Sequence, residues 1–220
     1  MDSLNVKEYG SNAGAAVVGI ASSDDFTDAP DGFRPSDVLV GCRSVIIVGC
    51  PFTQESLLGT PAEYTDVRNA MFKRVDAIAK EVAKQIKKEG YRTKVLGGLS
   101  GKWVDGLSVG HISIKHAAEL AGIGMIGKNY LLINKEYGTL LWFSAILTDA
   151  ELVPDEKARY GICDDCNKCV EACPTGALDD ISVFKKRECA RTCFKMVNRK
   201  WELHCYLCRK ICPHRFGIKL

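Results

Sequence analysis

The sequence predicts an α/β domain over residues 1–156, followed by a smaller cysteine-rich module over residues 157–220. Two observations lead to this division. Strand-like and helix-like patterns mix through residues 1–148, which is typical of an α/β domain. Nine of the eleven cysteines lie after residue 160. The segment 149–161 is polar, contains Pro154 and has no periodicity, so we expect it to be a linker.

The composition is that of a globular protein. Of the 220 residues, 46% are hydrophobic and 26% are charged, which argues against a disordered or collagen-like chain. No apolar run reaches the roughly 20 residues that a membrane-spanning helix needs, and the N-terminus lacks the pattern of a signal peptide. Clustered cysteines without an export signal indicate metal binding in a reducing compartment rather than disulfide bonds. We therefore expect a cytoplasmic protein with no membrane association.

Two apolar runs near the N-terminus predict strands. Residues 16–21 form a short strand candidate. Residues 44–50 read Ser-Val-Ile-Ile-Val-Gly-Cys, a β-branched run that fits a strand buried on both faces. Pro51 should end it. The segment between these strands, residues 22–41, is polar and punctuated by proline and glycine, so we expect a loop.

The clearest helix is predicted over residues 66–89, because apolar residues recur there at three- and four-residue steps. These residues are Val67, Met71, Val75, Ile78, Val82 and Ile86. Thr65 is the expected cap at its start and Gly90 at its end. Residues 91–96 alternate in polarity like a strand.

The remainder of the α/β domain alternates between loop, helix and strands. Residues 97–110 contain five glycines and predict a loop. Residues 111–120 predict a helix that stops at Gly122. Apolar runs at 130–134 and 139–147 predict two strands joined by a turn.

The most specific pattern is the run Cys163-x2-Cys166-x2-Cys169-x3-Cys173-Pro174. It matches the cluster-binding motif of bacterial ferredoxins. In that motif, three thiolates hold one [4Fe–4S] cluster and the fourth ligates another cluster. The run therefore predicts a second cysteine motif elsewhere in the chain.

The second motif is present near the C-terminus. Its three cysteines have the expected spacing and precede a proline; they are Cys205, Cys208 and Cys212. The first cysteine of the usual pattern is missing, because Glu202 occupies its place. Either Cys189 or Cys193 can supply the missing thiolate.

The ligand count then closes for two [4Fe–4S] clusters. The first cluster is predicted to bind Cys163, Cys166, Cys169 and Cys212. The second is predicted to bind Cys173, Cys205, Cys208 and one of Cys189 or Cys193. Zinc sites also use two-residue spacings, but they do not need this run twice, so we favour iron–sulfur clusters.

The C-terminal module is basic, with 14 Lys or Arg and 7 Asp or Glu in residues 157–220. A basic surface can indicate a nucleic-acid partner. Two thiolate-bound clusters of about −2 charge each would offset much of this excess. The charge therefore leaves a nucleic-acid partner open without favouring it.

A glycine turn, Gly122-Ile-Gly124-Met-Ile-Gly127-Lys128-Asn129, matches GxGxxG and nearly matches the P-loop pattern. Both nucleotide motifs need a strand before them and a helix after them. The expected order here is the reverse, and Asn129 replaces the Ser or Thr that would bind magnesium. Two interpretations stay open: a helix C-cap with a tight turn, and close backbone approach to a large, flat cofactor.

Several segments, taken together, resemble a known family. They are residues 37–52, His116 to Asn129, Leu131-Leu132-Ile133, Tyr137-Gly138, Ile146 to Asp149 and the CxxCxxCxxxCPTGA run. They are similar to the epoxyqueuosine reductases and, more distantly, to the corrinoid reductive dehalogenases. The resemblance extends over most of the chain.

This resemblance implies a nitroreductase-like, cobalamin-binding α/β domain joined to a two-cluster ferredoxin-like module. Electrons would pass from a reduced ferredoxin or flavodoxin-type donor through the clusters to a corrinoid, which reduces the substrate. Asp105, in the pair Val104-Asp105, matches the proton donor of the family. The glycine turn would approach the corrinoid through Gly122, Gly124, Gly127, Lys128 and Asn129. The family pattern also favours Cys189 over Cys193.

The sequence departs from the family at three places. The segment between Asp105 and Gly122 is longer, and the Pro and Glu that usually follow the aspartate are absent. The chain stops at Leu220, before the helical repeat domain of the tRNA enzyme. We therefore expect a short, oxygen-sensitive paralogue acting on a small molecule or a modified nucleoside. The alternatives are an electron-transfer or corrinoid-handling protein without its own substrate, and a tRNA epoxyqueuosine-type reductase.

Overall fold

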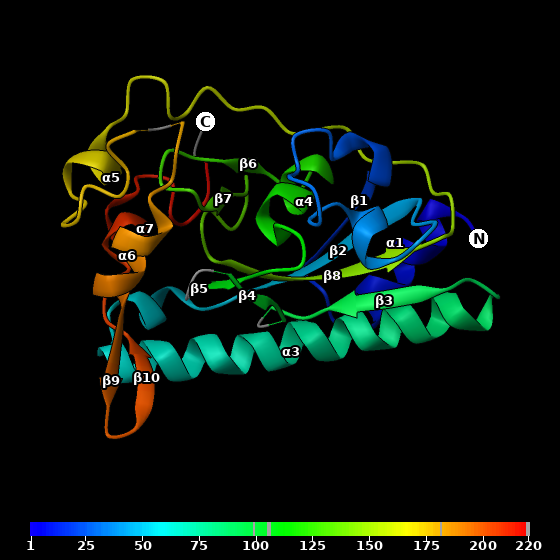
Figure 1. The fold of residues 1–220 in the computed structure, drawn as a ribbon, viewed down its shortest axis with the longest axis horizontal. Helices are drawn as coiled ribbons and strands as arrows, with labels where there is room; N and C mark the ends of the chain where they lie inside the picture. Colours follow the sequence, from blue (N-terminus) through cyan, green and yellow to red (C-terminus); the bar gives the residue numbers. More distant parts are fainter. Residues whose placement is uncertain (99, 105–106, 181, 219–220) are drawn as a thin grey trace. The chain divides into compact units, whose positions relative to one another are not determined.

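The computed structural model describes residues 1–98, 100–104, 107–180 and 182–218. The chain forms two compact units, which draw on several segments each (Figure 1). Unit 1 comprises residues 1–51, 71–124 and 142–158, and unit 2 comprises residues 52–70, 125–141 and 159–220. Because a compact unit can combine distant segments, the domain limit at residue 156 stays a prediction.

The main sheet of unit 1 has the strand order β1-β2-β8-β3. The strands are β1 (Val17–Ser22), β2 (Ser44–Pro51), β3 (Thr93–Leu96) and β8 (Leu141–Thr148). β1 pairs antiparallel with β2, and β3 pairs antiparallel with β8. All four strands agree with the predicted runs. β2 is buried from Ser44 to Cys50, as the continuous β-branched run predicted.

The longest helix, α3 (Pro61–Lys88), begins one turn earlier than predicted. A reciprocal cap starts it: the Thr60 N–H donates to the Glu63 carboxylate at 2.8 Å, and the Glu63 N–H donates to the Thr60 hydroxyl at 3.3 Å. This is a capping box, so the predicted cap, Thr65, is wrong. Gly90 ends the helix as predicted, with a φ of +91° that suits glycine.

The other helices of unit 1 are short: α1 (Ser3–Asn12), the 3-10 turn η1 (Ser23–Asp25), α2 (Pro35–Val38) and α4 (Ile114–Leu120). The sequence did not predict α1, because the helix buries only Val6 and Gly10 and so has little apolar periodicity. α4 occupies the C-terminal part of the predicted helix 111–120.

Residues 97–110 are not a simple loop. They contain an antiparallel hairpin of β4 (Lys102–Val104) and β5 (Leu107–Val109). Each strand has only three residues, which is too short for an alternating pattern to stand out among five glycines. The two residues between the strands, Asp105 and Gly106, lie outside the described part of the chain.

Unit 2 contains short elements. They are η2 (Gln54–Leu57), β6 (Met125–Ile126), β7 (Leu132–Ile133), α5 (Lys168–Glu171), α6 (Lys186–Cys193), β9 (Phe194–Val197), β10 (Lys200–Leu203) and α7 (Leu207–Ile211). The predicted strand 130–134 is reduced to β7, because Tyr130 has a φ of 55°, which a strand cannot contain. Among the residues described, no helix is long and apolar enough to cross a membrane.

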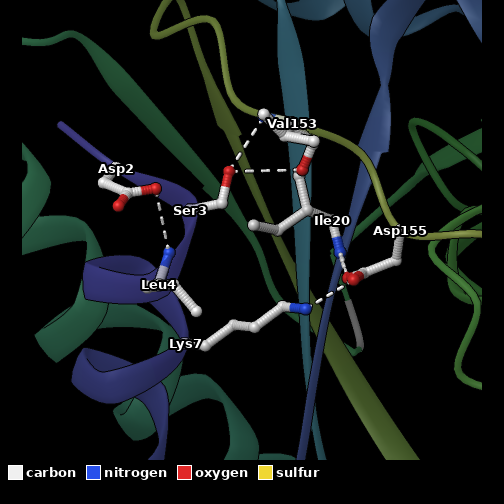
Figure 2. A network of polar contacts seen from close by, with 7 residues as sticks. All are labelled: Asp2, Ser3, Leu4, Lys7, Ile20, Val153 and Asp155. Carbon is white, nitrogen blue, oxygen red and sulfur yellow. Dashed lines mark hydrogen bonds and ion pairs between the residues drawn. The ribbon is translucent and has the colours of Figure 1, made fainter.

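A polar network covers the open edge of β1 in unit 1 (Figure 2). The Asp155 carboxylate accepts the N–H of Ile20 at 2.9 Å and forms an ion pair with Lys7. The Asp155 N–H donates to the Ile20 carbonyl at 2.8 Å. The Ser3 hydroxyl exchanges hydrogen bonds with the backbone of Val153. Asp155 therefore pairs with both backbone groups of Ile20 at this edge of β1, where they would otherwise be unpaired.

We expect Asp155→Ala to lower the free energy of unfolding by about 1–3 kcal/mol, because it leaves the buried N–H of Ile20 without its acceptor. Asp155→Asn is the matched control, since its amide oxygen can still accept that N–H while the ion pair is lost. An exposed ion pair contributes at most about 1 kcal/mol, so the asparagine variant should lose less. Urea unfolding measures both. Equal losses of unfolding free energy in the two variants would show that the ion pair, and not the backbone hydrogen bond, provides the stabilisation.

Candidate metal centres

Four cysteines from distant parts of unit 2 line one pocket. They are Cys163, Cys166, Cys169 and Cys212. The same pocket is lined by Lys128, Asn129, Ile133, Ile162, Pro213 and His214. The structure thus brings together the four residues predicted to hold the first cluster. Four thiolates in a largely apolar surrounding form a suitable donor set for an iron–sulfur cluster.

Cys212 reaches this pocket because the following residues are anchored to the turn before β8. The Thr139 N–H donates to the Arg215 carbonyl at 3.1 Å, and the Ile218 N–H donates to the Lys135 carbonyl at 2.8 Å. Gly138 has a φ of +56°, and a Cβ there would lie 2.2 Å from the His214 carbonyl oxygen. A glycine is therefore required where the two segments meet.

The first cysteine loop is held by the end of the glycine turn. The Lys128 ammonium donates to the Asp164 carbonyl at 3.1 Å and to the Asn167 side chain at 2.9 Å. A Cβ on Gly127 would lie 3.2 Å from the Cys163 sulfur. The sequence predicted Lys128 at the rim of a corrinoid, and the structure places its ammonium against the loop that carries Cys163 and Cys166.

Asn129 connects the glycine turn to the second cysteine motif. It is buried, and its amide donates to the Cys208 carbonyl at 3.4 Å, while its oxygen accepts the Leu131 N–H at 3.1 Å. A short polar side chain with a donor and an acceptor satisfies both backbone groups at once. Sequence reasoning missed this bracing role, because it depends on a segment far away in the chain.

The start of the glycine turn lies in unit 1 and ends helix α4. The Gly122 N–H donates to Glu119 at 3.1 Å and the Ile123 N–H donates to Ala118 at 3.0 Å. Gly122 has a φ of +69°, and a Cβ there would lie 2.3 Å from the Glu156 carbonyl oxygen. The C-cap interpretation is therefore confirmed for this residue. The helix α4 precedes the turn and the short strands β6 and β7 follow it, which is the element order that the sequence predicted.

A second group of cysteines gathers around α6 and α7. Cys189 and Cys193 lie one turn apart on α6, and their thiols are hydrogen-bonded to each other. The Cys193 thiol also donates to the Cys205 carbonyl at 3.1 Å. Cys208 lies within electrostatic range of Cys189 and Cys205. These four residues are two of the three firmly predicted ligands of the second cluster, Cys205 and Cys208, together with both candidates for its fourth ligand.

Cys173, the remaining predicted ligand of the second cluster, has a polar surrounding of its own. Its sulfur lies 3.6 Å from the Thr175 hydroxyl. Burial opposes ionisation of this thiol, but hydrogen bonds from the backbone and hydroxyl of Thr175 and from the N–H groups of Ala177 and Leu178 outweigh it and lower its pKa. The thiol of Cys173 therefore ionises more readily than an unperturbed cysteine.

Three thiols of the second motif and of α6 have raised pKa values and hold their protons more tightly. Burial, together with the neighbouring thiols Cys163, Cys169 and Cys166, raises the pKa of Cys212 to about 11. Burial likewise raises the pKa of Cys208 to about 11. The hydrogen bond with Cys189, followed by burial, raises the pKa of Cys193. Binding of a metal cluster must therefore release protons from these thiols.

The segment that carries the second motif is fixed to the first turns of α3, within unit 2. The rings of Tyr64 and Tyr206 stack with their centres 3.9 Å apart. The Tyr206 hydroxyl donates to the Gly59 carbonyl at 3.0 Å, and the Thr65 hydroxyl accepts the Leu203 N–H at 2.8 Å. The burial of Thr65 is explained by this contact rather than by helix capping.

Asp105, the predicted proton donor, lies outside the described residues. The residues before it, Trp103 and Val104, are 78% and 39% exposed on the hairpin. In the part of the chain that the structure describes, no three His, Cys, Asp or Glu side chains are arranged to hold a single metal ion. The role of Asp105 stays a prediction.

Comparison with known families identifies the first cysteine motif. Residues 159–179 match the model of a 4Fe-4S binding domain. This match covers Cys163, Cys166, Cys169 and Cys173 and agrees with the pocket geometry of the first three.

Comparison with curated proteins extends the likeness beyond this motif. An epoxyqueuosine reductase from Listeria monocytogenes is 34% identical over 50% of this chain and 32% of its own length. One from Gloeobacter violaceus is 30% identical over 80% of this chain and 57% of its own length. The chain is similar to epoxyqueuosine reductases. A tetrachloroethene reductive dehalogenase from Desulfitobacterium hafniense is 26% identical over 90% of this chain and 34% of its own length.

The predicted resemblance to both groups is therefore confirmed, and the relatives are oxidoreductases. The chain spans about a third to three fifths of the length of the epoxyqueuosine reductases compared.

Solved structures show the same fold. Epoxyqueuosine reductase from Streptococcus thermophilus matches 98% of this chain and 66% of its own, with a TM-score of 0.71 and 23% identity. An epoxyqueuosine reductase bound to an epoxyqueuosine-modified tRNA-Tyr stem loop matches 99% of this chain and 66% of its own, with a TM-score of 0.67 and 21% identity. A reductive dehalogenase, whose structure suggests a mechanism for B12-dependent dehalogenation, matches 78% of this chain and 24% of its own, with a TM-score of 0.60 and 20% identity.

Proposed function

We propose that the chain is an iron–sulfur reductase that passes electrons through two [4Fe–4S] clusters to a corrinoid. The observation that carries this proposal is the pocket in which Cys212 lies with Cys163, Cys166 and Cys169. Exchange of the fourth ligand between two motifs is typical of two-cluster ferredoxins. The match of residues 159–179 to a 4Fe-4S binding domain supports the first motif independently.

The proposal assigns ligands to both clusters. The first cluster binds Cys163, Cys166, Cys169 and Cys212. The second binds Cys173, Cys189, Cys205 and Cys208. The gathering of Cys189, Cys193, Cys205 and Cys208 supports this second set. When bound, the clusters supply one-electron transfer, and the apolar residues around the first pocket, such as Ile133 and Ile162, limit the access of water.

Metal analysis tests the clusters directly. Anaerobically reconstituted protein should contain about eight iron atoms per chain and a similar amount of acid-labile sulfide. Chelation of the metal under anaerobic conditions should abolish the broad cluster absorption and lower stability, because metal binding contributes to folding. Stoichiometric zinc without labile sulfide would contradict the proposal.

The corrinoid is the second part of the proposal. Its support is the common fold with a reductive dehalogenase for which a B12-dependent mechanism is suggested. The proposal includes a nitroreductase-like fold for the α/β domain, residues 1–156. A bound corrinoid would supply a cobalt centre that delivers electrons to the substrate. The residues proposed to approach it are Gly122, Gly124, Gly127, Lys128 and Asn129. Equilibrium titration of cluster-replete protein with cobalamin tests this step. Absence of binding would favour an electron-transfer protein without substrate chemistry.

We further propose that Asp105 donates the proton that the reduction requires. A carboxyl group can do this near neutral pH only if burial raises its pKa. Asp105→Asn should keep cobalamin binding and lower turnover about 100- to 10,000-fold. The first substrates to test are an epoxyqueuosine-modified tRNA stem loop and tetrachloroethene, which the names of the relatives suggest. Unchanged turnover with either substrate would show that Asp105 is only a turn residue.

The proposal also includes the setting of the reaction. A protein with this many thiol ligands needs a reducing compartment, so we propose a cytoplasmic location and sensitivity to oxygen. The substrate is a small molecule or a modified nucleoside. The electrons come from a reduced ferredoxin or flavodoxin-type protein.

A further inference from the structure

The hairpin of β9 and β10 is a protruding element of unit 2. The strands pair antiparallel, with Trp201 opposite Met196 and Leu203 opposite Phe194. The two turn residues, Asn198 and Arg199, have φ values of 47° and 62°. A two-residue turn with positive φ at both positions is typical of a tight β-hairpin. Figure 1 shows the hairpin extending beyond α6.

One face of the hairpin is apolar along its whole length, but only its base is packed. At the base, Leu203 is buried and the guanidinium of Arg68 lies 5.6 Å from the centre of the Phe194 ring. Further out on the same face, Met196 is 53% exposed and Trp201 is 61% exposed. Residues directly opposite each other in an antiparallel pair share a face. Met196 and Trp201 therefore form an apolar pair that the described structure leaves open to solvent.

Exposed cations accompany this apolar pair. Lys195, Arg199 and Lys200 are all exposed; Arg199 lies in the turn, and the register puts Lys195 and Lys200 on the opposite face of this narrow hairpin. The one acidic residue of the hairpin sequence, Glu202, lies 3.1 Å from the imidazole of His204. The outer part of the hairpin thus combines an aromatic and a thioether side chain with positive charge. Tryptophan is enriched at sites that dominate binding energy in protein interfaces, and positive charge close to such a site attracts an acidic partner.

The hairpin leads directly to the second group of cysteines. Cys193 precedes β9, and its carbonyl accepts the His204 N–H at 2.7 Å. The Cys193 thiol donates to the Cys205 carbonyl at 3.1 Å. At about 3.3 Å per residue, Trp201 lies within roughly 13 Å of Cys205 along the strand. A protein bound to the hairpin would therefore be close to this cysteine group.

We propose that the outer part of the hairpin docks a small electron-carrier protein with an acidic surface around its redox group: Met196 and Trp201 form the apolar contact face, and the positive charge of Arg199 in the turn and of Lys195 and Lys200 on the other face attracts the carrier. The inference rests on the proposed function, because the cysteine group must hold a redox centre. In the transfer, one electron leaves the reduced carrier and is accepted by the oxidised second centre. No covalent bond forms or breaks, and no proton is exchanged.

Two other partners fit part of this surface. A second copy of the chain could cover the apolar pair, and a nucleic acid could use the cations and stack on Trp201. The carrier protein is favoured because its surface would complement the charge of the hairpin and because the hairpin adjoins the redox cysteines. Neither alternative explains why the hairpin adjoins the second group of cysteines.

Binding of oxidised flavodoxin, an acidic carrier, tests the proposal on cluster-replete protein. Calorimetric titration at low salt should give a dissociation constant that Trp201→Ala weakens at least about 10-fold, as expected of an interface hot spot. Lys195→Glu with Lys200→Glu should weaken it similarly, and salt should weaken the wild-type complex. The matched controls are Trp103→Ala, which removes an even more exposed tryptophan on β4, and Lys80→Glu with Lys87→Glu on α3. Neither control should change binding by more than about two-fold.

A kinetic measurement separates docking from cluster chemistry. Reduced flavodoxin should reduce the hairpin variants about 10-fold more slowly than the wild type, whereas dithionite should reduce them all at one rate, because a small reductant needs no docking surface. Equal flavodoxin binding by wild type and hairpin variants would overturn the proposal, and so would a wild type that dithionite reduces but flavodoxin does not. If sedimentation shows a wild-type dimer that Trp201→Ala dissociates, the surface belongs to a second copy of the chain. If the hairpin variants lose tRNA binding but keep flavodoxin binding, the surface belongs to a nucleic acid. Protein that holds no reducible cluster would instead contradict the proposed function.

Discussion

Replacing Cys212 with serine should remove the first cluster and leave the second in place. Cys212 lies in the second motif, only one helical turn after Cys208, so a simple assignment by neighbourhood would predict the opposite result. The pocket geometry assigns Cys212 to the first cluster, because its side chain lines the same pocket as Cys163 and Cys166. Loss of one thiolate should reduce the iron content from about eight to about four atoms per chain.

Two reference variants identify which cluster is lost. Cys166→Ser removes a predicted ligand of the first cluster, and Cys205→Ser removes a predicted ligand of the second. The electron paramagnetic resonance spectrum of reduced Cys212→Ser should match that of Cys166→Ser. Cys42→Ser, a change at a buried thiol outside the module, should retain all of the iron. A spectrum that matches Cys205→Ser would disprove the exchange of ligands.

The second large effect is expected at α6. Cys189→Ser should lose the second cluster, whereas Cys193→Ser should keep it. The resemblance to the epoxyqueuosine reductases points to Cys189. The structure places both thiols in the second cysteine group, where the Cys193 thiol also donates to the Cys205 carbonyl, so the two variants decide between them.

Iron analysis and the spectrum of Cys205→Ser again provide the comparison. If Cys189→Ser retains about eight iron atoms and Cys193→Ser does not, Cys193 and not Cys189 is the fourth ligand. If both single variants keep the second cluster, either one thiol replaces the other or the fourth ligand lies elsewhere. The double variant, Cys189→Ser with Cys193→Ser, distinguishes these two cases, because it loses the cluster only in the first.

Most of the main sheet could be predicted from local patterns. The run at β2 is continuous and β-branched because the strand is buried on both faces, and this leaves an unmistakable pattern. The end of α3 was equally clear, since Gly90 alone can adopt the left-handed conformation at low cost. The start of α3 was missed because Thr60 and Glu63 form a cap that lies before the apolar repeat begins.

Within the candidate site, the glycine turn shows where local reasoning stops. The sequence indicated that glycines were needed but not what approaches them. In the structure, the Glu156 carbonyl lies against Gly122 and the Cys163 sulfur lies against Gly127. Both neighbours come from more than thirty positions away in the chain, and no local pattern records such contacts. The bracing role of Lys128 was missed for the same reason.

The cysteine spacings alone therefore indicate the kind of centre this chain holds. Thiolates must follow one another at fixed short intervals to surround a cluster, and a local sequence pattern is enough to reveal those intervals. Tertiary structure decides which distant cysteine lines the pocket of the first motif. Cys212 joins Cys163 because hydrogen bonds from Thr139 and Ile218 fix the C-terminal segment to the turn before β8. Such contacts join segments far apart in the sequence. Closing the chain between them costs conformational entropy, and packing in the whole fold must offset that cost.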